Sequence, residues 1–291
     1  MKLLSFGEII WDIFPSAACI GGAPLNFAAH AAMQGADTYM LSAVGDDELG
    51  KRALDELTAL GVATEHVSVS AKPTGSCVVT LDQAGVPSYD LKGDTAYDDV
   101  ACPTLGDGHG FDVISFGTLA LRGTHNRELL ARVLSENRFP TVFSDLNIRA
   151  PFYSDESIAF CMEHATIVKI SDEELDTVTA SCLGYTLSVE DAARALAKKY
   201  AQLTLVIITK GADGAYAYDT ASGVGYSCPA FPAEAVSTVG AGDSFGATFL
   251  TQYFSGKSIP ECLDAASRVS GFVVSCTGAV PKYDLCELLA K

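Results

Sequence analysis

The chain has few basic residues. Its 291 residues include 19 Lys and Arg against 36 Asp and Glu, which gives a formal net charge of −17. Binding to the phosphates of nucleic acid requires a surplus of Lys and Arg, so we expect no nucleic-acid partner. The same charge balance means that an anionic substrate would need local help from backbone amides, Mg²⁺ or a few well-placed cations.

Long apolar runs are also lacking. No stretch approaches the roughly 18 residues that a membrane-spanning helix needs, and the apolar start of the chain is too short for a secretion signal. The nine cysteines are odd in number and form no CxxC pair. This pattern indicates reduced thiols rather than a disulfide framework or a zinc site. We therefore expect a cytoplasmic protein with no membrane partner.

Short apolar runs alternate with amphipathic runs along the chain. This alternation predicts an α/β fold with a mostly parallel sheet and helices on its faces. No repeat or linker interrupts it, so we expect a single domain over residues 1–291. The expected strands lie at 3–9, 113–117, 141–146, 166–170 and 205–209, and the expected helices at 47–60, 127–137, 190–200 and 259–275.

One stretch departs from this alternation. Residues 77–81 and 86–91 are short apolar runs around the turn 82–85, which is typical of a hairpin. A hairpin alone is only marginally stable in water, so it must pack on something. It could lie on the main sheet, or it could form a small sheet with the segment near 9–20 and cover a cleft.

A glycine loop, residues 240–242, opens an expected helix near the C-terminus. Aromatic residues then recur at four-residue spacing, which predicts a helix: Phe245, Phe249 and Tyr253. Unpaired N–H groups and the positive end of the helix dipole make such a start an anion site. Asp243 stands in that positive field. A carboxylate beside an anion site suggests a group that handles a proton, so we interpret the segment as an anion hole with a base.

Residues 21–26 open a second helix after two glycines, with Pro24 suited to its first turn. This loop could bring the backbone and Asn26 against a polar ligand, or it could be an ordinary tight turn into a core helix. The five histidines show no ligand spacing, and we interpret them as surface or capping groups.

Charged residues follow two of the expected strands. Because the carboxyl ends of strands face the ligand crevice in open α/β sheets, Arg149 and Lys169 could supply positive charge there. Glu174 could act on Mg²⁺ through water, since Mg²⁺ keeps much of its hydration. The alternative for 172–174 is acidic capping of a helix start.

Two nucleotide-binding patterns fail on inspection. Residues 45–51 fit the start of a P-loop, but Arg52 stands where Ser or Thr should hold Mg²⁺ and three acids would repel phosphate. Those acids suit the first turn of a helix instead. Residues 240–246 resemble a dinucleotide fingerprint with one residue too many, which leaves a dehydrogenase as a weak alternative.

Seven segments of the chain form one ordered set: Gly7-Glu8 with Asp12, GGAPLN at 21–26, VGDDELG at 44–50, DLNIR at 145–149, VKISDEEL at 168–175, TKGADG at 209–214 and VGAGDSFGATF at 239–249. In this order they resemble the ribokinase-like (PfkB-type) carbohydrate kinases, and most closely their fructokinase branch. The resemblance implies a central, mostly parallel sheet flanked by helices, with a small β-sheet lid formed by about 9–20 and 75–97.

The family transfers the γ-phosphoryl group of ATP to a sugar hydroxyl with Mg²⁺, so ATP, Mg²⁺ and a sugar are the implied ligands. By resemblance, Asp243 is the catalytic base and the amides of Gly240, Ala241 and Gly242 form the anion hole. The remaining implied positions are Asp12, Gly22, Asn26 and Arg149 for the sugar, Lys169, Thr209, Gly211 and Gly214 for the nucleotide, and Glu174 for the metal.

Two positions depart from the family pattern. Ser237 stands where an Asp usually helps to bind a monovalent cation, so activation by K⁺ is uncertain. Ser171 replaces the Asn of an Asn-x-x-Glu motif but leaves Glu174 in place.

We expect a fructokinase, with 2-keto-3-deoxygluconate kinase and ribokinase as alternatives within the family. Outside enzyme function, a non-catalytic sugar or nucleotide sensor on the same fold is the alternative, although a sensor has no use for the base. A homodimer through the lid is a further expectation.

Overall fold

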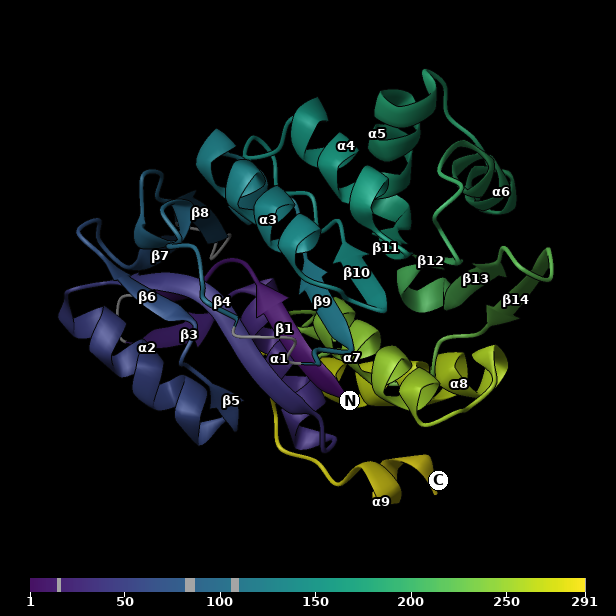
Figure 1. Cartoon of the computed structure of the whole chain (residues 1–291). Helices are drawn as coiled ribbons and strands as arrows, with labels where there is room; N and C mark the ends of the chain where they lie inside the picture. The colour runs from purple at the N-terminus through teal and green to yellow at the C-terminus, as the bar shows by residue number, and fades with distance from the viewer. Residues whose placement is uncertain (15–16, 82–86, 106–109, 291) are drawn as a thin grey trace.

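The computed structural model describes residues 1–14, 17–81, 87–105 and 110–290. Its main sheet has ten strands in the order β14-β13-β12-β11-β10-β9-β1-β4-β5, with β6 paired to β4 (Figure 1). The strands from β12 to β5 run parallel, whereas β13 and β14 are antiparallel additions at one edge. The strands are β1 (Lys2–Phe6), β4 (Asp37–Gly45), β5 (Val62–Ala63), β6 (Val67–Ser70), β9 (Val113–Phe116), β10 (Thr141–Asp145), β11 (Ile167–Ser171), β12 (Leu205–Thr209), β13 (Ala215–Asp219) and β14 (Val224–Cys228).

Helices cover both faces of this sheet. On one face, α3 (Thr124–Glu136), α4 (Asp155–His164), α5 (Asp172–Leu183) and α6 (Val189–Lys199) pack over one apolar cluster. On the other, α1 (Ala23–Met33), α7 (Ala241–Phe254) and α8 (Ile259–Val274) pack with α2 (Glu48–Ala59) over two further clusters. The short α9 (Leu285–Leu289) follows, and 3₁₀ turns lie at η1 (Ala96–Asp98), η2 (Leu119–Leu121) and η3 (Gly211–Asp213).

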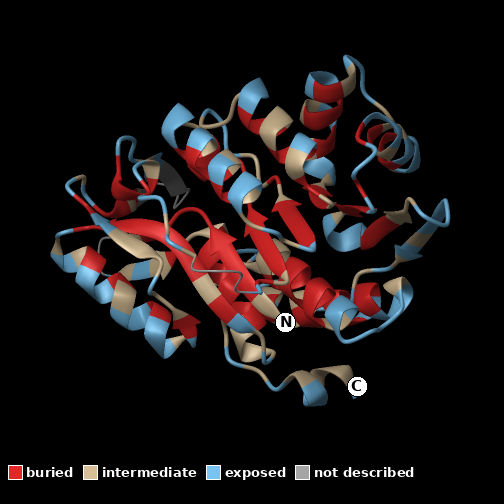
Figure 2. Cartoon of the chain, viewed as in Figure 1, coloured by how far each residue is buried: buried red, intermediate tan, exposed pale blue. Residues whose placement is uncertain are grey.

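The central strands are buried on both faces, as a parallel sheet between two helix layers requires. All four residues of β9 are buried, and the core strands form the continuous buried centre of the molecule in Figure 2. The α/β fold predicted from the alternation of apolar runs is therefore confirmed. Among the described residues, no helix has the length and apolar character to cross a membrane.

A second, four-stranded sheet lies apart from the main one in the order β3-β2-β7-β8. It contains β2 (Ile10–Ile13), β3 (Ala18–Gly21), β7 (Gly75–Leu81) and β8 (Pro87–Leu91). The segment near 9–20 thus pairs with the hairpin through the parallel contact of β2 with β7, and the small-sheet alternative is confirmed. The expected turn at 82–85 lies outside the described residues.

The segment 45–51 starts helix α2 and forms no phosphate loop. Asp47 is the N-cap, and its carboxylate accepts hydrogen bonds from Gly50 N at 2.7 Å and from Thr74 N at 2.8 Å. Asp47 and Glu48 therefore lie at a helix start, as expected from their charge, and Asp47 also bonds to Thr74 just before β7.

Candidate active site

The glycine loop starts α7 at the carboxyl edge of the main sheet. Gly240 is the N-cap with φ 83°, and a Cβ there would lie 2.3 Å from the main-chain oxygen of Ala279. Only glycine tolerates both the left-handed conformation and this close approach. Ala241 N donates to Thr238 O at 3.2 Å. Within the described chain, the N–H groups of Gly242 and Asp243 have no recorded partner and remain available to an anion.

Asp243 is half-buried in the first turn of α7, and its carboxylate is held by the start of α1. Asn26 Nδ2 donates to Asp243 Oδ2 at 2.8 Å. Burial raises the pKa of Asp243 to about 6, the hydrogen bond from Asn26 opposes that rise, and the charge of Asp145 adds to it. The site therefore contains a carboxyl group whose pKa lies slightly below neutral pH.

Lys169 and Asp145 form a buried ion pair next to the glycine loop. Their partner strands β10 and β11 set these residues side by side, and Lys169 Nζ lies 2.8 Å from Asp145 Oδ2. Burial alone would lower the pKa of Lys169, but the negative charge of Asp145 raises it overall. A Cβ on Gly242 would lie 3.3 Å from Lys169 Nζ, so the ammonium group backs the loop. A permanent cation thus stands beneath the available amides.

The start of α1 closes the other side of the site. Gly22 is the N-cap of α1, and Ala23 N donates to Glu8 Oε1 at 3.2 Å. Glu8 is 4% exposed, and burial raises its pKa to about 7. The buried Asn26 Oδ1 has no partner among the described residues, which leaves an acceptor free for a ligand.

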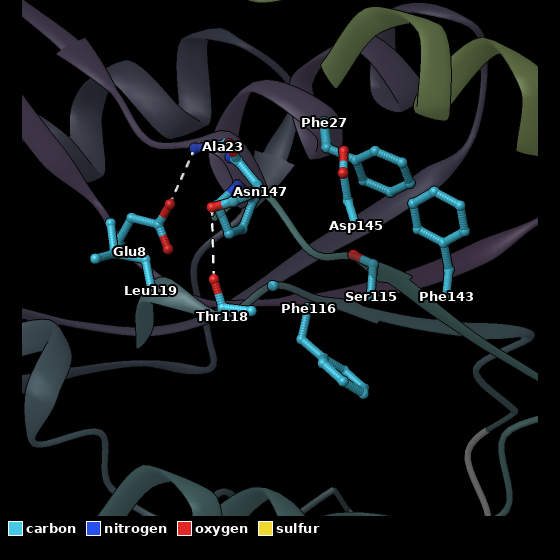
Figure 3. A pocket seen from close by; sticks show the side chains of 12 residues that line it. Glu8, Ala23, Phe27, Ser115, Phe116, Thr118, Leu119, Phe143, Asp145 and Asn147 are labelled. Atoms are coloured by element: carbon cyan, nitrogen blue, oxygen red, sulfur yellow. Dashed lines mark hydrogen bonds between the residues drawn. The ribbon is translucent and has the colours of Figure 1, made fainter. Parts of the chain in front are cut away.

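A pocket lies between the start of α1 and the carboxyl ends of β9 and β10 (Figure 3). Glu8 and Asp145 stand at opposite sides of it, with Thr118 and Asn147 between them, and Phe27 and Phe143 add an apolar wall. The charge of Asp243 raises the pKa of Glu8, so these two carboxyl groups lie near enough to interact. Neither Glu8 nor Asp145 was assigned a role from the sequence, although both follow or end strands at the carboxyl edge.

Asp12 reaches this region from the small sheet. It lies on β2 between Cys19 of β3 and Cys77 of β7. Its Oδ2 is 3.6 Å from the position of a Cβ on Gly21, the residue before Gly22. Burial raises the pKa of Asp12. The predicted sugar positions Asp12, Gly22 and Asn26 are therefore brought together around the start of α1.

Glu174 is engaged by backbone amides. Its Oε2 accepts from Ser171 N at 2.8 Å and its Oε1 accepts from Ile148 N at 2.5 Å, so it joins the loop after β10 to the start of α5. The capping alternative is thus confirmed. Each carboxylate oxygen of Glu174 still has a free lone pair that could bind a metal-coordinated water. Among the described residues, no group of three His, Cys, Asp or Glu side chains has the arrangement of a metal site.

Arg149 lies on the exposed loop after β10. Its charge lowers the pKa values of Glu8, Asp145 and Asp243, which places its guanidinium group near all three carboxyls. No ion pair of Arg149 is recorded in the part of the chain that the structure describes.

The predicted nucleotide positions lie farther along the same edge. Thr209 ends β12 opposite Ser171, and η3 follows at Gly211–Asp213. Gly211 is exposed, with nothing within 4 Å of an added Cβ, whereas a Cβ on Gly214 would lie 2.0 Å from Cys228 O. Because β14 lies so close, only glycine fits at position 214. Gly211 has open space beside it.

Comparison with known proteins identifies relatives along the whole chain. Residues 19–284 match the family described as pfkB family carbohydrate kinase. A fructokinase of Rhizobium leguminosarum bv. trifolii is 30% identical over 85% of this chain and 78% of its own length. A 5-dehydro-2-deoxygluconokinase of Geobacillus thermodenitrificans is 26% identical over 92% and 83%.

Solved structures agree on the fold. A fructokinase from Vibrio cholerae O395, in a form with fructose, ADP and calcium ion bound, superposes with a TM-score of 0.82 at 23% identity. The superposition covers 99% of this chain and 98% of the other. The large mostly parallel sheet, its helices and the separate small sheet are common to both folds.

Proposed function

The chain belongs to the pfkB family of carbohydrate kinases, and from that membership we propose that it is a fructokinase. As a carbohydrate kinase it transfers a phosphoryl group to a sugar hydroxyl. The proposal is that the acceptor is fructose and that ATP is the donor, with Mg²⁺ required.

The observation that carries the proposal is the environment of Asp243. Its carboxyl group has a pKa raised to about 6, and Asn26 orients it at the start of a helix whose first amides are available. In our proposal, Asp243 accepts the proton of the attacking sugar hydroxyl. A base with a pKa slightly below working pH is ionised yet still a good proton acceptor.

The glycine loop would bind the transferred phosphoryl group. Phosphoryl transfer through a loose transition state requires mainly positioning and stabilisation of charge. The amides of Gly240, Gly242 and Asp243, which have no recorded partner among the described residues, offer fixed positive charge together with the ammonium group of Lys169. The Ala241 amide, which the resemblance also assigned to the anion hole, donates to Thr238 O instead. Such groups stabilise developing negative charge without rearranging.

The sugar would lie between the start of α1 and the small sheet. We assign its hydroxyls to Asp12, Gly22 and Asn26, whose unpartnered Oδ1 can accept a hydroxyl proton. The carboxyl groups of Glu8 and Asp243 lie near enough to interact with each other here, and their negative charge favours a neutral sugar over a sugar acid. The small sheet would act as a lid that keeps water from competing as the acceptor.

We assign the nucleotide to the loop after β12, at Thr209, Gly211 and Gly214. Glu174 fits Mg²⁺ only through water, because both of its oxygens already accept backbone N–H bonds. When bound, the ion would neutralise phosphate charge.

The position of Ser237 argues against a strong requirement for K⁺. Its N–H donates to Val274 O at 3.1 Å, and its side chain offers a hydroxyl group where a carboxylate would bind a cation more strongly.

A 2-keto-3-deoxygluconate kinase is the second candidate, and Arg149 favours it. Its guanidinium group lies near Glu8 and Asp243 without a recorded ion pair among the described residues, so it could bind a substrate carboxylate. A ribokinase remains the third possibility within the family.

The test is a substrate panel. Purified protein with Mg-ATP is incubated with fructose, glucose, ribose, a nucleoside and 2-keto-3-deoxygluconate, and ADP release is followed for each. We expect the highest kcat/KM with fructose. A higher value with the sugar acid or with ribose would overturn the choice of acceptor. Sugar binding without ADP release for any acceptor would support the sensor alternative instead.

A matched variant separates the two leading acceptors. Arg149→Gln should leave kcat/KM for fructose within about 3-fold if the acceptor is neutral, because a neutral sugar has no carboxylate for the guanidinium group to bind. A loss of about 100-fold or more with the preferred acceptor would indicate a substrate carboxylate.

A further inference from the structure

Three polar residues, Asn26, His30 and Gln34, follow one another at four-residue spacing along α1 and its C-cap. This spacing places side chains above one another on one face of a helix. His30 is 0% exposed and Asn26 is 5% exposed, so their polar atoms need partners inside the protein. The interpretation of His30 as a surface or capping group is therefore wrong.

His30 bonds to the C-terminal segment through both ring nitrogens. Nε2 lies 2.9 Å from Ala279 O, and Nδ1 lies 3.0 Å from the hydroxyl of Tyr283. The carbonyl oxygen can only accept, so Nε2 carries the proton and Nδ1 accepts from the Tyr283 hydroxyl. The ring is neutral in this arrangement, in agreement with the burial that lowers the pKa of His30 to about 4.

Gln34 continues the same set of bonds. Its Nε2 donates to Tyr283 Oη at 2.8 Å and to Thr248 Oγ1 at 2.7 Å, and its Oε1 accepts from Thr251 Oγ1. We call His30, Gln34, Ala279 and Tyr283 the His30 network. It joins α1 to Thr248 of α7 and to the C-terminal segment that leads to α9 (Figure 1).

The peptide that His30 holds is the one against which the glycine loop packs. A Cβ on Gly240 would lie 2.3 Å from Ala279 O and 2.7 Å from Ala279 Cα, so the two backbones are in direct contact. One helical turn before His30, on the same face of α1, Asn26 bonds to Asp243 at 2.8 Å. One face of α1 therefore contacts Asp243 directly and supports Gly240 through Ala279.

We propose that His30 is a positioning residue for phosphoryl transfer, which holds the Ala279 peptide against Gly240 and so keeps the amides of the glycine loop in register with Asp243. This inference rests on the proposed roles of Asp243 and the glycine loop. Fixed donors stabilise a transition state only while their geometry is kept, and displacements of about 1 Å can cost about 100-fold in rate. A residue that acted only on the fold would change stability without a selective loss of kcat.

Two variants and one control test the inference. His30→Phe keeps a ring of similar size but removes both nitrogens, and Tyr283→Phe removes only the hydroxyl and leaves the ring against Phe272. The control is Thr251→Val, which breaks a bond to Gln34 at the end of the network that does not touch Ala279. Unfolding by denaturant, kcat, and KM for sugar and ATP are measured for each.

We expect His30→Phe to lower kcat by about 10- to 100-fold, and Tyr283→Phe by less, with KM for the sugar within about 3-fold of wild type. Thr251→Val should lose stability but keep kcat within about 2-fold. A folded His30→Phe protein with unchanged kcat would overturn the inference. An equal loss of kcat in Thr251→Val at equal stability would do the same.

The assignment of donors and acceptors in the His30 network can be tested without measuring catalysis. The ¹⁵N resonances of the His30 ring, identified by their absence in His30→Phe, should report a neutral ring protonated at Nε2 at about pH 7. A ring protonated at Nδ1, or a charged ring, would overturn the network. If the wild-type protein phosphorylates no sugar, both the proposed function and this inference fail. If the wild type is active and His30→Phe is equally active, only this inference is refuted.

Discussion

Two substitutions that each add one methyl group to the glycine loop should act in different ways. Gly240 has φ 83°, and a Cβ there would lie 2.3 Å from Ala279 O. The left-handed conformation costs an alanine about 1–2 kcal/mol, and forcing apart two packed backbones costs about 1–3 kcal/mol more. We therefore expect Gly240→Ala to lower the free energy of unfolding by about 2–5 kcal/mol, with loss of activity as a consequence.

Gly242 differs because the one atom outside its own helix that comes within 4 Å of an added Cβ, among the described residues, is Lys169 Nζ at 3.3 Å. Alanine gains about 0.5–1 kcal/mol over glycine within a helix, which offsets a small displacement of Lys169. The free energy of unfolding of Gly242→Ala should therefore stay within about 1 kcal/mol of wild type. Its methyl group would point toward the Lys169 ammonium group, next to the amides at which we expect the phosphoryl group to bind. We expect kcat to fall by about 100-fold, as for the loss of one oxyanion donor.

Urea unfolding followed by fluorescence gives the stability of both variants, and a coupled assay of ADP release gives kcat. Gly242→Ala with kcat within about 2-fold of wild type would refute the assignment of the glycine loop as the anion hole. A Gly242→Ala protein as unstable as Gly240→Ala would show that the loop packs differently from this description.

Three further predictions concern the ions and protons of the site. Because Asp243 must lose its proton to act as a base, kcat/KM should rise as pH increases through about 6 and then level off, and a profile that falls over this range would contradict the role. Glu174→Gln should raise the Mg²⁺ concentration needed for half-maximal rate by about 10-fold, and an unchanged requirement would exclude Glu174 from metal binding. Replacing K⁺ by Na⁺ should change the rate by less than about 2-fold, since Ser237 lacks a carboxylate, and a large drop would reveal a cation site.

The sequence predicts much of this fold because its patterns are local. The apolar runs at 113–117 and 205–209 correspond to β9 (Val113–Phe116) and β12 (Leu205–Thr209), and the aromatic spacing after the glycine loop corresponds to α7 (Ala241–Phe254). The residue pattern alone left the small sheet as one of two alternatives, and only the family resemblance favoured it, because its assembly depends on pairing between β2 and β7, more than 60 residues apart in the chain.

Other features depend on packing that no local pattern records. The sequence places Lys169 and Asp145 at strand ends, but their ion pair requires the register of β10 against β11. The sequence around His30 does not show that this residue is buried, because its cover comes from α7 and Ala279, far away in the chain. Glu8 follows a strand, yet its raised pKa results from burial that α1 completes. Long-range burial and register decide each of these cases.

The central claim is that Asp243 accepts the proton of the sugar hydroxyl, and Asp243→Asn tests it most directly. Asparagine has nearly the same shape and can still accept the hydrogen bond from Asn26, but it cannot act as a base. We predict that kcat with the preferred sugar falls by at least about 100-fold, the lower limit for losing a general base, while the dissociation constant of the sugar changes little. Activity within a few-fold of wild type would contradict the account.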